Sequence, residues 1–361
     1  MTDRDETSHG AATRRRFLRG VRATGTVTAL AATGATPVRT ALADTDSGAD
    51  LGDGTWTRRT VDHTVNGNTT ERVYYAYLPP SYDASTVVPL VTMLHGCDQD
   101  PEGFAVGTEM NELADEETFL AIYPDQTRDA NSSECWNWFD DHNQHRGGKE
   151  ARLIATMTRD AMDRWAVDGD RVYVCGMSAG GAQAVNQAVT YPDLYAAVAS
   201  HSGLEYDAAN DATEAVAAME TGGPDPDVAG ERAYEEMVSN GVDRVVPAYV
   251  VHGDVDTTVR PVNGEQTARQ WLQTNDLADD GADDDSVDAT PDTTTTGTSD
   301  GGYHYTVERY EDESGDPVVT YVTEDELGHN WSGGDADGPN TDPLGEPVTP
   351  RIWSFFERNP Q

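Results

Sequence analysis

Short runs of apolar and β-branched residues alternate along the chain with longer stretches in which apolar residues recur at helical spacing. The short runs are typical of buried strands and cover residues 73–78, 87–94, 119–123, 171–175, 196–200, 247–251 and 318–322. The stretches at helical spacing cover residues 110–117, 151–165, 180–189, 231–239, 266–274 and 350–358. Strands and helices in alternation predict an α/β domain, with a mostly parallel central sheet and helices on both faces.

One segment breaks this alternation. Residues from about 277 to 302 are almost wholly Asp, Thr, Gly, Ala and Ser. Such a composition buries too little apolar surface to offset the loss of chain entropy, so we predict a disordered acidic insertion there. The chain of 361 residues is otherwise long enough for one well-buried core, and we expect residues 44–361 to form a single domain around that insertion.

The N-terminus reads T-R-R-R-F-L-R-G over residues 13–20, followed by a weakly apolar stretch and by A-L-A over residues 41–43. This order is typical of a twin-arginine export signal with an A-x-A cleavage site, and a basic arm that stays on the protein is the alternative. We predict that residues 1–43 are a signal for the twin-arginine export machinery and that the protein is secreted. No later run of about 18 apolar residues follows, which predicts no membrane insertion.

The chain is strongly acidic throughout, with 65 acidic and 24 basic residues and a formal net charge of -41. Lys149 is its single lysine. In molar salt the screening length falls to about 3 Å, so such self-repulsion is tolerated there. We interpret the charge as adaptation to a very salty medium. An acidic surface for a basic partner, the alternative, predicts a local acidic block instead. Nucleic-acid binding is disfavoured.

A G-x-S-x-G pattern, G-M-S-A-G-G, stands between the predicted strand 171–175 and the helix that follows it. At such a turn, small flanking residues let a strained backbone pass close to its neighbours while the serine projects outward. The helix N-terminus directs free N–H groups and the positive end of its dipole at the same place. We therefore predict that Ser178 is a nucleophile in an α/β-hydrolase fold.

A serine hydroxyl is a weak nucleophile and needs a base, which in turn needs an orienting carboxylate. In this fold the chain order is Ser, acid, His. The histidines downstream of both Ser178 and a plausible acid are His304 and His329. His304 lies within the alternating run Y-H-Y-T-V, typical of a strand residue, whereas His329 lies in G-H-N-W after the last predicted strand. We select His329 as the base.

Two aspartates follow the predicted strand 247–251, in the run H-G-D-V-D-T-T-V. Asp254 and Asp256 both lie at the carboxyl end of that strand, where catalytic groups gather in open α/β sheets. Either one also fits a solvated loop residue that caps a turn. We select Asp256 and keep Asp254 as its rival, and we expect His252 to support the loop.

Acyl transfer also needs backbone N–H groups aimed at the oxygen on which negative charge develops. One N–H should come from Ala179, directly after the nucleophile. The second should come from the loop H-G-C-D-Q after the predicted strand 87–94, and we assign it to the main chain of Cys97. This chemistry requires no cofactor.

Several motifs in order resemble one family. They read M-L-H-G-C-D-Q, G-T-E-M-N-E-L-A-D with F-L-A-I-Y-P-D-Q, C-W-N-W-F, G-M-S-A-G-G, H-G-D-V-D-T-T-V and G-H-N-W-S-G-G. The chain from about 72 to 358 resembles the esterase family of poly(3-hydroxybutyrate) depolymerases, which includes feruloyl and acetylxylan esterases. The resemblance implies a Ser178, Asp256 and His329 triad with an oxyanion hole from Cys97 and Ala179, and so favours Asp256 over Asp254. The acidic insertion and the lack of an added substrate-binding or linker domain depart from the family, and that lack argues against attack on solid polymer granules.

Other residues carry weaker signals. Cys97 and Cys135 occur in motifs that flank the expected site, so we predict a disulfide between them in an oxidising setting, with Cys175 as a small buried residue.

The sequence also contains an aromatic cluster. We predict that Trp136, Trp138 and Trp331 form a wall of the substrate site, and core packing is the alternative interpretation. The sequence contains no H-E-x-x-H pattern, so we do not expect a catalytic zinc. Asp335 and Asp337 fit a solvated loop better than a calcium site.

Taken together, the sequence predicts a secreted serine esterase that acts on small or oligomeric esters through an acyl-enzyme. Three alternatives remain open at this point: an acyltransferase on the same fold, a peptidase, and a secreted binding protein in which Ser178 is idle. Pocket shape distinguishes hydroxybutyrate oligomers, feruloyl esters and acetyl esters, and the sequence does not determine it.

Overall fold

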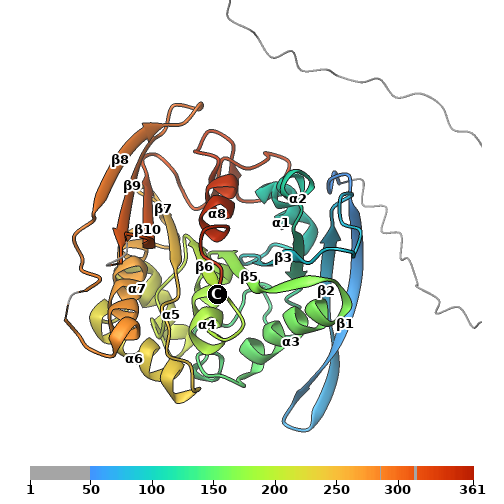
Figure 1. The fold of residues 1–361 in the computed structure, drawn as a ribbon, viewed down its shortest axis with the longest axis horizontal. Helices are drawn as coiled ribbons and strands as arrows, with labels where there is room; N and C mark the ends of the chain where they lie inside the picture. The colour runs from blue at the N-terminus through green and yellow to red at the C-terminus, as the bar shows by residue number, and fades with distance from the viewer. Residues whose placement is uncertain (1–48, 285, 313–314) are drawn as a thin grey trace, which may run out of the picture. The chain divides into compact units, whose positions relative to one another are not determined.

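A ten-stranded mixed sheet forms the centre of the fold (Figure 1). The computed structural model describes residues 49–284, 286–312 and 315–361, so the predicted signal at 1–43 lies outside the described residues. The strand order is β1-β2-β4-β3-β5-β6-β7-β10-β9-β8. The strands are β1 (Thr55–Val65), β2 (Asn68–Leu78), β3 (Val88–Leu94), β4 (Leu120–Pro124), β5 (Val167–Met177), β6 (Ala197–His201), β7 (Ala248–Gly253), β8 (Thr293–Thr298), β9 (His304–Glu311) and β10 (Pro317–Glu324).

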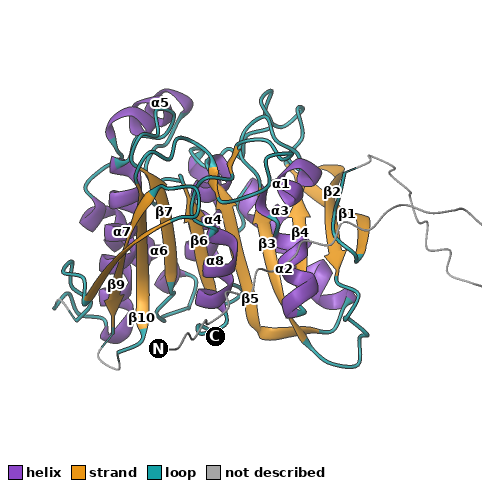
Figure 2. Ribbon diagram, turned by 90° about the horizontal axis from the view of Figure 1, so that it is seen from above, coloured by secondary structure: helices purple, strands orange, loops and turns teal. Residues whose placement is uncertain are grey.

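The middle of the sheet is parallel and both edges are antiparallel. Strands β4, β3, β5, β6, β7 and β10 pair in parallel with one another in that order. At one edge β2 runs antiparallel to β4 and to β1, and at the other β9 runs antiparallel to β10 and β8. Figure 2 shows the strands side by side, with β1 and β2 at one edge. A parallel centre places the carboxyl ends of β3, β5, β6 and β7 at one side, where the predicted site residues follow them.

Helices cover both faces of the sheet, as predicted (Figure 1). One face carries α1, α2 and α8, and the other carries α3, α4, α6 and α7. Because strand side chains alternate, Val172 and Val174 of β5 enter one core while Tyr173 and Cys175 enter the other. The helices are α1 (Pro101–Thr108), α2 (Met110–Glu117), α3 (Lys149–Arg164), α4 (Ala179–Thr190), α5 (Ala212–Thr221), α6 (Pro226–Ser239), α7 (Val262–Asp280) and α8 (Val348–Phe356).

The predicted fold class is confirmed, since each of the predicted strands and helices overlaps an element of the structure. The predicted elements did not include β1, β8, β9 or the helices α1 and α5, although the alternating run around His304 marked the start of β9. Strand β1 pairs with β2 over its whole length but is only partly buried, so its apolar signal is weak. Pairing with a neighbouring strand, rather than burial of its own side chains, makes this segment a strand.

The prediction of disorder over 277–302 is wrong for much of that segment. Helix α7 continues through Asp280, and the threonine-rich run Thr293–Thr298 forms β8 against β9. Threonine is β-branched and suits a strand even where its side chains are exposed. Asp276 also accepts the N–H of Val287 at 3.1 Å and the hydroxyl of Ser286 at 2.9 Å. Backbone pairing and polar contacts therefore order a segment that has few apolar residues.

Within the described part of the chain, no helix is both long enough and apolar enough to cross a membrane. Cys175 is buried and unpaired in β5, as predicted. A second, two-stranded parallel sheet joins β11 (Trp331–Ser332) to β12 (Thr341–Asp342) and holds the segment that follows His329.

Candidate active site

The turn from β5 into α4 places Ser178 in a strained conformation against the end of β3. Ser178 has φ 56° and ψ -123°, and its N–H donates to the carbonyl of His201 at 2.9 Å. A Cβ at Gly180 would lie 2.0 Å from the Leu94 carbonyl oxygen, and one at Gly176 would lie 2.3 Å from the Gly180 oxygen. Only glycine fits at both places, which explains the two glycines of the G-x-S-x-G pattern.

The first turn of α4 leaves donors free beside Ser178. The Ser178 side chain makes no capping hydrogen bond. The Ala179 N–H has no acceptor among the described residues, and such N–H groups carry the positive end of the helix dipole. Ala179 therefore lies where an oxyanion donor was predicted.

An aspartate and a histidine from two different loops meet at the carboxyl edge of the sheet. His329 Nδ1 lies 2.7 Å from Asp256 Oδ2, and the carboxylate is buried. Its other oxygen accepts the N–H groups of Thr258 at 2.8 Å and Val259 at 2.9 Å. Burial acts to raise the pKa of Asp256, but the hydrogen bond and charge of His329 outweigh it, so the pKa lies below its ordinary value. The carboxylate is thus held ionised toward the imidazole.

The two rival residues lie elsewhere. Asp254 accepts the N–H of Glu326 at 2.7 Å and is exposed. His304 begins β9, next to the edge strand β8, where its Nδ1 lies 2.9 Å from the hydroxyl of Thr298. Of the alternatives left open by the sequence, the structure therefore brings together Asp256 and His329.

Two buried histidines support this region. His252, as expected, holds the aspartate loop, because its Nε2 donates to the carbonyl of Val259 at 2.8 Å. His201 was missed. Its carbonyl holds Ser178, and its Nε2 accepts the N–H of Ser332 at 3.2 Å. Burial and the nearby His252 lower the pKa of His201 to about 3, so the ring is neutral. Its position at the end of a buried strand was the signal available in the sequence.

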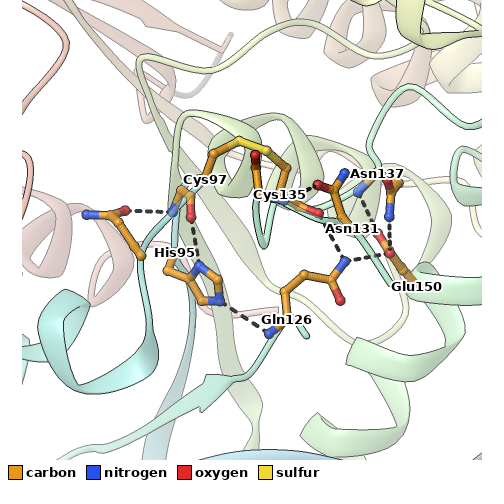
Figure 3. Close-up of a disulfide and its surroundings, with 10 residues drawn as sticks. His95, Cys97, Gln126, Asn131, Cys135, Asn137 and Glu150 are labelled. Carbon is orange, nitrogen blue, oxygen red and sulfur yellow. Dashed lines mark hydrogen bonds between the residues drawn. A yellow bond between two sulfur atoms is a disulfide. The ribbon is translucent and has the colours of Figure 1, made fainter. Parts of the chain in front are cut away.

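The loop after β3 lies against Ser178. A Cβ at Gly96 would lie 3.3 Å from the Ser178 Cβ. The N–H of Gly96 donates to Gln99 Oε1 at 2.7 Å, whereas that of Cys97 has no acceptor among the described residues. Cys97 is joined to Cys135 by a disulfide (Figure 3). The structure thus contains the predicted pairing, and the Cys97 N–H makes no hydrogen bond to the described residues.

The three tryptophans do not form an open wall. Trp136, Trp138 and Trp331 are 0%, 4% and 1% exposed. Trp331 stacks on His201 with ring centroids 5.0 Å apart and donates its indole N–H to Thr349 at 3.0 Å. The prediction of a substrate wall is therefore corrected in favour of core packing, which suits large rings that bury much apolar surface.

Nearby surfaces are acidic rather than metal-binding. A cavity of about 760 Å³ lies beside Gln99 and Pro339 and is lined by several carboxylates, but Ser178 does not line it. No group of three or more His, Cys, Asp or Glu in the described ranges is placed to hold a metal ion. The Asp335 side chain accepts the N–H of Asp337 at 2.8 Å, which is a local turn contact.

The fold defines the class: it is the α/β-hydrolase fold, with Ser178 at the turn after β5 and Asp256 in contact with His329. An acetyl xylan esterase from Aspergillus awamori shares the fold with a TM-score of 0.64 at 20% identity, over 84% of this chain and 99% of that one. An S-formylglutathione hydrolase from Agrobacterium tumefaciens does so with a TM-score of 0.51 at 14% identity, over 85% and 96% of the two chains.

Residues 72–290 match the family model described as esterase PHB depolymerase, and the chain belongs to that family. It is 30% identical to poly(3-hydroxyalkanoate) depolymerase C of Paucimonas lemoignei, over 71% of this chain and 57% of that protein. It is 29% identical to feruloyl esterase B of Thermothelomyces thermophilus, over 56% of this chain and 70% of that protein. The resemblance found in the motifs is confirmed. The chain spans little more than half the length of the depolymerase.

Proposed function

We propose that this protein hydrolyses carboxylic esters through an acyl-enzyme formed on Ser178. The observation that carries the proposal is the 2.7 Å contact between His329 Nδ1 and the buried Asp256, at the sheet edge that also bears the strained Ser178 turn. Membership of an esterase family supports the same reaction. Ser178, Asp256 and His329 are the residue types that acyl transfer requires, in the chain order typical of this fold.

In the first half of the reaction, His329 Nε2 takes the proton of the Ser178 hydroxyl while Oγ bonds to the ester carbonyl carbon. Asp256 holds Nδ1–H and stabilises the imidazolium that forms. The carbonyl oxygen becomes an oxyanion that accepts the N–H groups of Cys97 and Ala179. The carbon–oxygen bond to the alcohol then breaks, and the alcohol leaves with the proton from His329.

In the second half, water attacks the acyl group on Ser178. His329 takes one proton from that water and returns it to Ser178 Oγ as the acyl bond breaks. The products are a carboxylic acid and the free enzyme. No step requires a cofactor, since the charges are stabilised by groups of the chain itself.

The proposed substrates are those named for the relatives: hydroxyalkanoate oligomers, feruloyl esters and acetyl esters of sugars. We propose short soluble esters as the substrates to test first. Hydrolysis of p-nitrophenyl acetate and butyrate provides the first test, followed by oligomers of hydroxybutyrate against feruloyl and acetyl sugars.

We further propose that the protein is exported and works in concentrated salt. The basic 13–20 segment with A-L-A at 41–43 supports export, and the net charge of -41 supports the salt requirement. Activity and folding should therefore be measured in several-molar salt, with a low-salt sample beside it.

The decisive comparison is wild type against Ser178→Ala in that buffer. Ser200→Ala is a matched control, because Ser200 is a buried serine of the neighbouring strand β6 whose hydroxyl has no hydrogen-bond partner among the described residues. We expect Ser178→Ala to lose activity, Ser200→Ala to keep it, and a phosphonate probe to label a peptide containing Ser178. Full activity of a folded Ser178→Ala protein contradicts the proposal.

A further inference from the structure

We infer that the cavity between α8 and the strands β7, β9 and β10 binds a small organic dianion, a phosphate ester or a dicarboxylate. The cavity has a volume of about 490 Å³ and lies on the face of the sheet that carries α8. Ser178, Asp256 and His329 do not line it. The inference therefore goes beyond the proposed ester hydrolysis and does not depend on it.

The strand residues that line this cavity lie toward the amino ends of β7 and β10. Tyr249 follows directly on the first residue of β7, and Pro317 and Thr320 belong to the first half of β10. The candidate catalytic residues instead follow the carboxyl ends of the strands that precede them. A molecule bound in the cavity is therefore not in the proposed ester site.

The lining of this cavity is basic although the protein is acidic. The chain has 24 basic and 65 acidic residues, yet Arg309, Arg351 and Arg358 all line this one cavity. Glu346 is the single carboxylate among its described lining residues. Four other cavities in the described part of the chain have more carboxylates than basic side chains in their linings. This lining thus has an excess positive charge that a dianion would neutralise.

Two of the three guanidinium groups are unpaired. Neither the half-buried Arg309 nor the exposed Arg358 makes a side-chain hydrogen bond or ion pair with the residues that the structure describes. The helix dipole favours a cation at Arg358, just beyond the end of α8, but Arg309 lies on the strand β9. Like charges around one cavity repel each other, and an anion bound between them would remove that repulsion.

Arg351 is held in place but keeps a free donor. Its Nε donates to Glu346 Oε1 at 2.8 Å, and its Nη2 donates to the Tyr305 hydroxyl at 2.8 Å. The guanidinium carbon also lies 4.8 Å from the centroid of the Tyr305 ring. Nη1 makes no hydrogen bond within the described ranges. A guanidinium fixed in this way suits the paired oxygens of a carboxylate or a phosphate.

The buried side of the cavity offers a hydroxyl and apolar rings. Tyr249 and Phe355 are 4% and 6% exposed, and their ring centroids lie 5.4 Å apart. Burial raises the pKa of Tyr249 although the charges of Arg351 and Arg309 act to lower it, so the hydroxyl is neutral and can donate. Three prolines also line the cavity. Apolar surface beside the charged groups favours an anion with an organic body over a bare inorganic ion.

Equilibrium dialysis tests the binding directly. The dianionic probes are phenyl phosphate and phthalate, benzoate has one charge, and benzyl alcohol has none. The buffer is at about pH 8, where the phosphate is doubly charged, with the lowest NaCl concentration at which circular dichroism shows folded protein. We expect at least one dianion to bind with a Kd of about 1 mM or lower, about 10-fold more tightly than benzoate. Benzyl alcohol should bind more weakly still, and the tighter dianion identifies the head group.

Three variants locate the bound anion. Arg309→Gln and Arg358→Gln each remove one charge from the cavity, and Arg58→Gln removes one from β1 at the opposite edge of the sheet. Each cavity variant should weaken dianion binding about 10-fold, and Arg58→Gln should leave it unchanged. Because Arg309 and Arg358 have no partner among the described residues, both variants should fold, which circular dichroism checks.

Several outcomes would overturn the inference. Failure of the folded wild type to bind either dianion does so, and equal affinity for benzyl alcohol and phenyl phosphate does so because the pocket is then merely apolar. Unchanged binding in both cavity variants places the anion elsewhere. Equal losses in Arg58→Gln and in the cavity variants reveal a general effect of net charge. None of these measurements depends on Ser178, so they remain valid if the proposed hydrolysis fails.

Discussion

The two halves of the candidate site are held in place by different kinds of contact. The nucleophile and oxyanion half, at the ends of β3 and β5, is held by closely packed main chain, with no room for a Cβ at Gly176 or Gly180. The acid and base half, at β7 and after β10, consists of two side chains, Asp256 and His329, that meet at 2.7 Å. The first half is set by excluded volume and the second by charge and hydrogen bonding.

This difference implies two kinds of sensitivity. Adding one methyl group should damage the main-chain half, because protein interiors are close-packed and backbone atoms cannot move aside. Isosteric changes that remove charge should damage the side-chain half, because the orientation of an imidazole depends on its acceptor. Four experiments test this difference in sensitivity between the two halves.

The largest effect is expected from Asp256→Asn. The amide keeps the size of the side chain but favours the wrong histidine tautomer, so kcat should fall by about 10⁴-fold while the fold persists. Asp254→Asn is the matched control, since the Asp254 carboxylate faces the N–H of Glu326. Ester hydrolysis at saturating substrate measures both. Equal losses in the two variants would show that the acid was wrongly assigned.

Removal of the disulfide should come next. The Cys97–Cys135 bond closes a loop with a sequence separation of 38 residues, and its loss should lower the free energy of unfolding by about 2–5 kcal/mol. Cys135→Ala tests this by urea unfolding, with the free buried Cys175→Ala as the control. An unfolding midpoint that falls no further in Cys135→Ala than in Cys175→Ala counts against a structural disulfide.

Gly180→Ala tests the excluded volume of the main-chain half. Its Cβ would lie 2.0 Å from the Leu94 oxygen, so we expect a loss of about 3 kcal/mol in stability and a loss of activity. Gly169→Ala is the control, because a Cβ there meets nothing within 4 Å. Thermal unfolding and ester hydrolysis measure both properties. A Gly180→Ala protein as stable and active as Gly169→Ala would mean that the turn can relax.

The smallest effect concerns pH and His201. Its folded-state pKa is lowered to about 3, so the unfolded chain takes up a proton near pH 6.5 that the folded protein does not. Its contribution to stability is therefore complete above pH 6.5 and declines as the pH falls toward 3. One such proton gives about 1.4 kcal/mol per pH unit. The stability gap between wild type and His201→Asn should narrow from pH 6 to 4 in urea titrations, and a constant gap would contradict this.

Much of the fold was predictable because its signals are local. The buried strands from β3 to β7 are continuous apolar runs, and helix α2 was predicted over the residues that form it. The polar edge was not predictable, since β8 is made of exposed threonines and exists through its pairing with β9. Apolar periodicity reports burial, and it says little about segments ordered by backbone pairing.

The candidate site divides in the same way. Glycine spacing around Ser178 and the chain order of serine, acid and histidine are sequence properties, and they led to the three residues that the structure brings to one sheet edge. The burial of Trp136 and Trp138 could not be predicted from the sequence, because an aromatic cluster fits a core and a binding wall equally well. The catalytic roles of Ser178, Asp256 and His329 are predictions that the variants described above test.

By itself, the sequence determined the alternation of strands and helices, the glycine-lined turn that presents Ser178, and the family to which the chain belongs. These depend on residue types at short spacing, where local sterics and periodicity decide the outcome. The motif resemblance favoured Asp256 over Asp254, but only the tertiary structure brought Asp256 into contact with His329 and buried Trp136 and Trp138 in the core. Those choices depend on distances of a few ångströms between segments far apart in the chain, which no local pattern encodes.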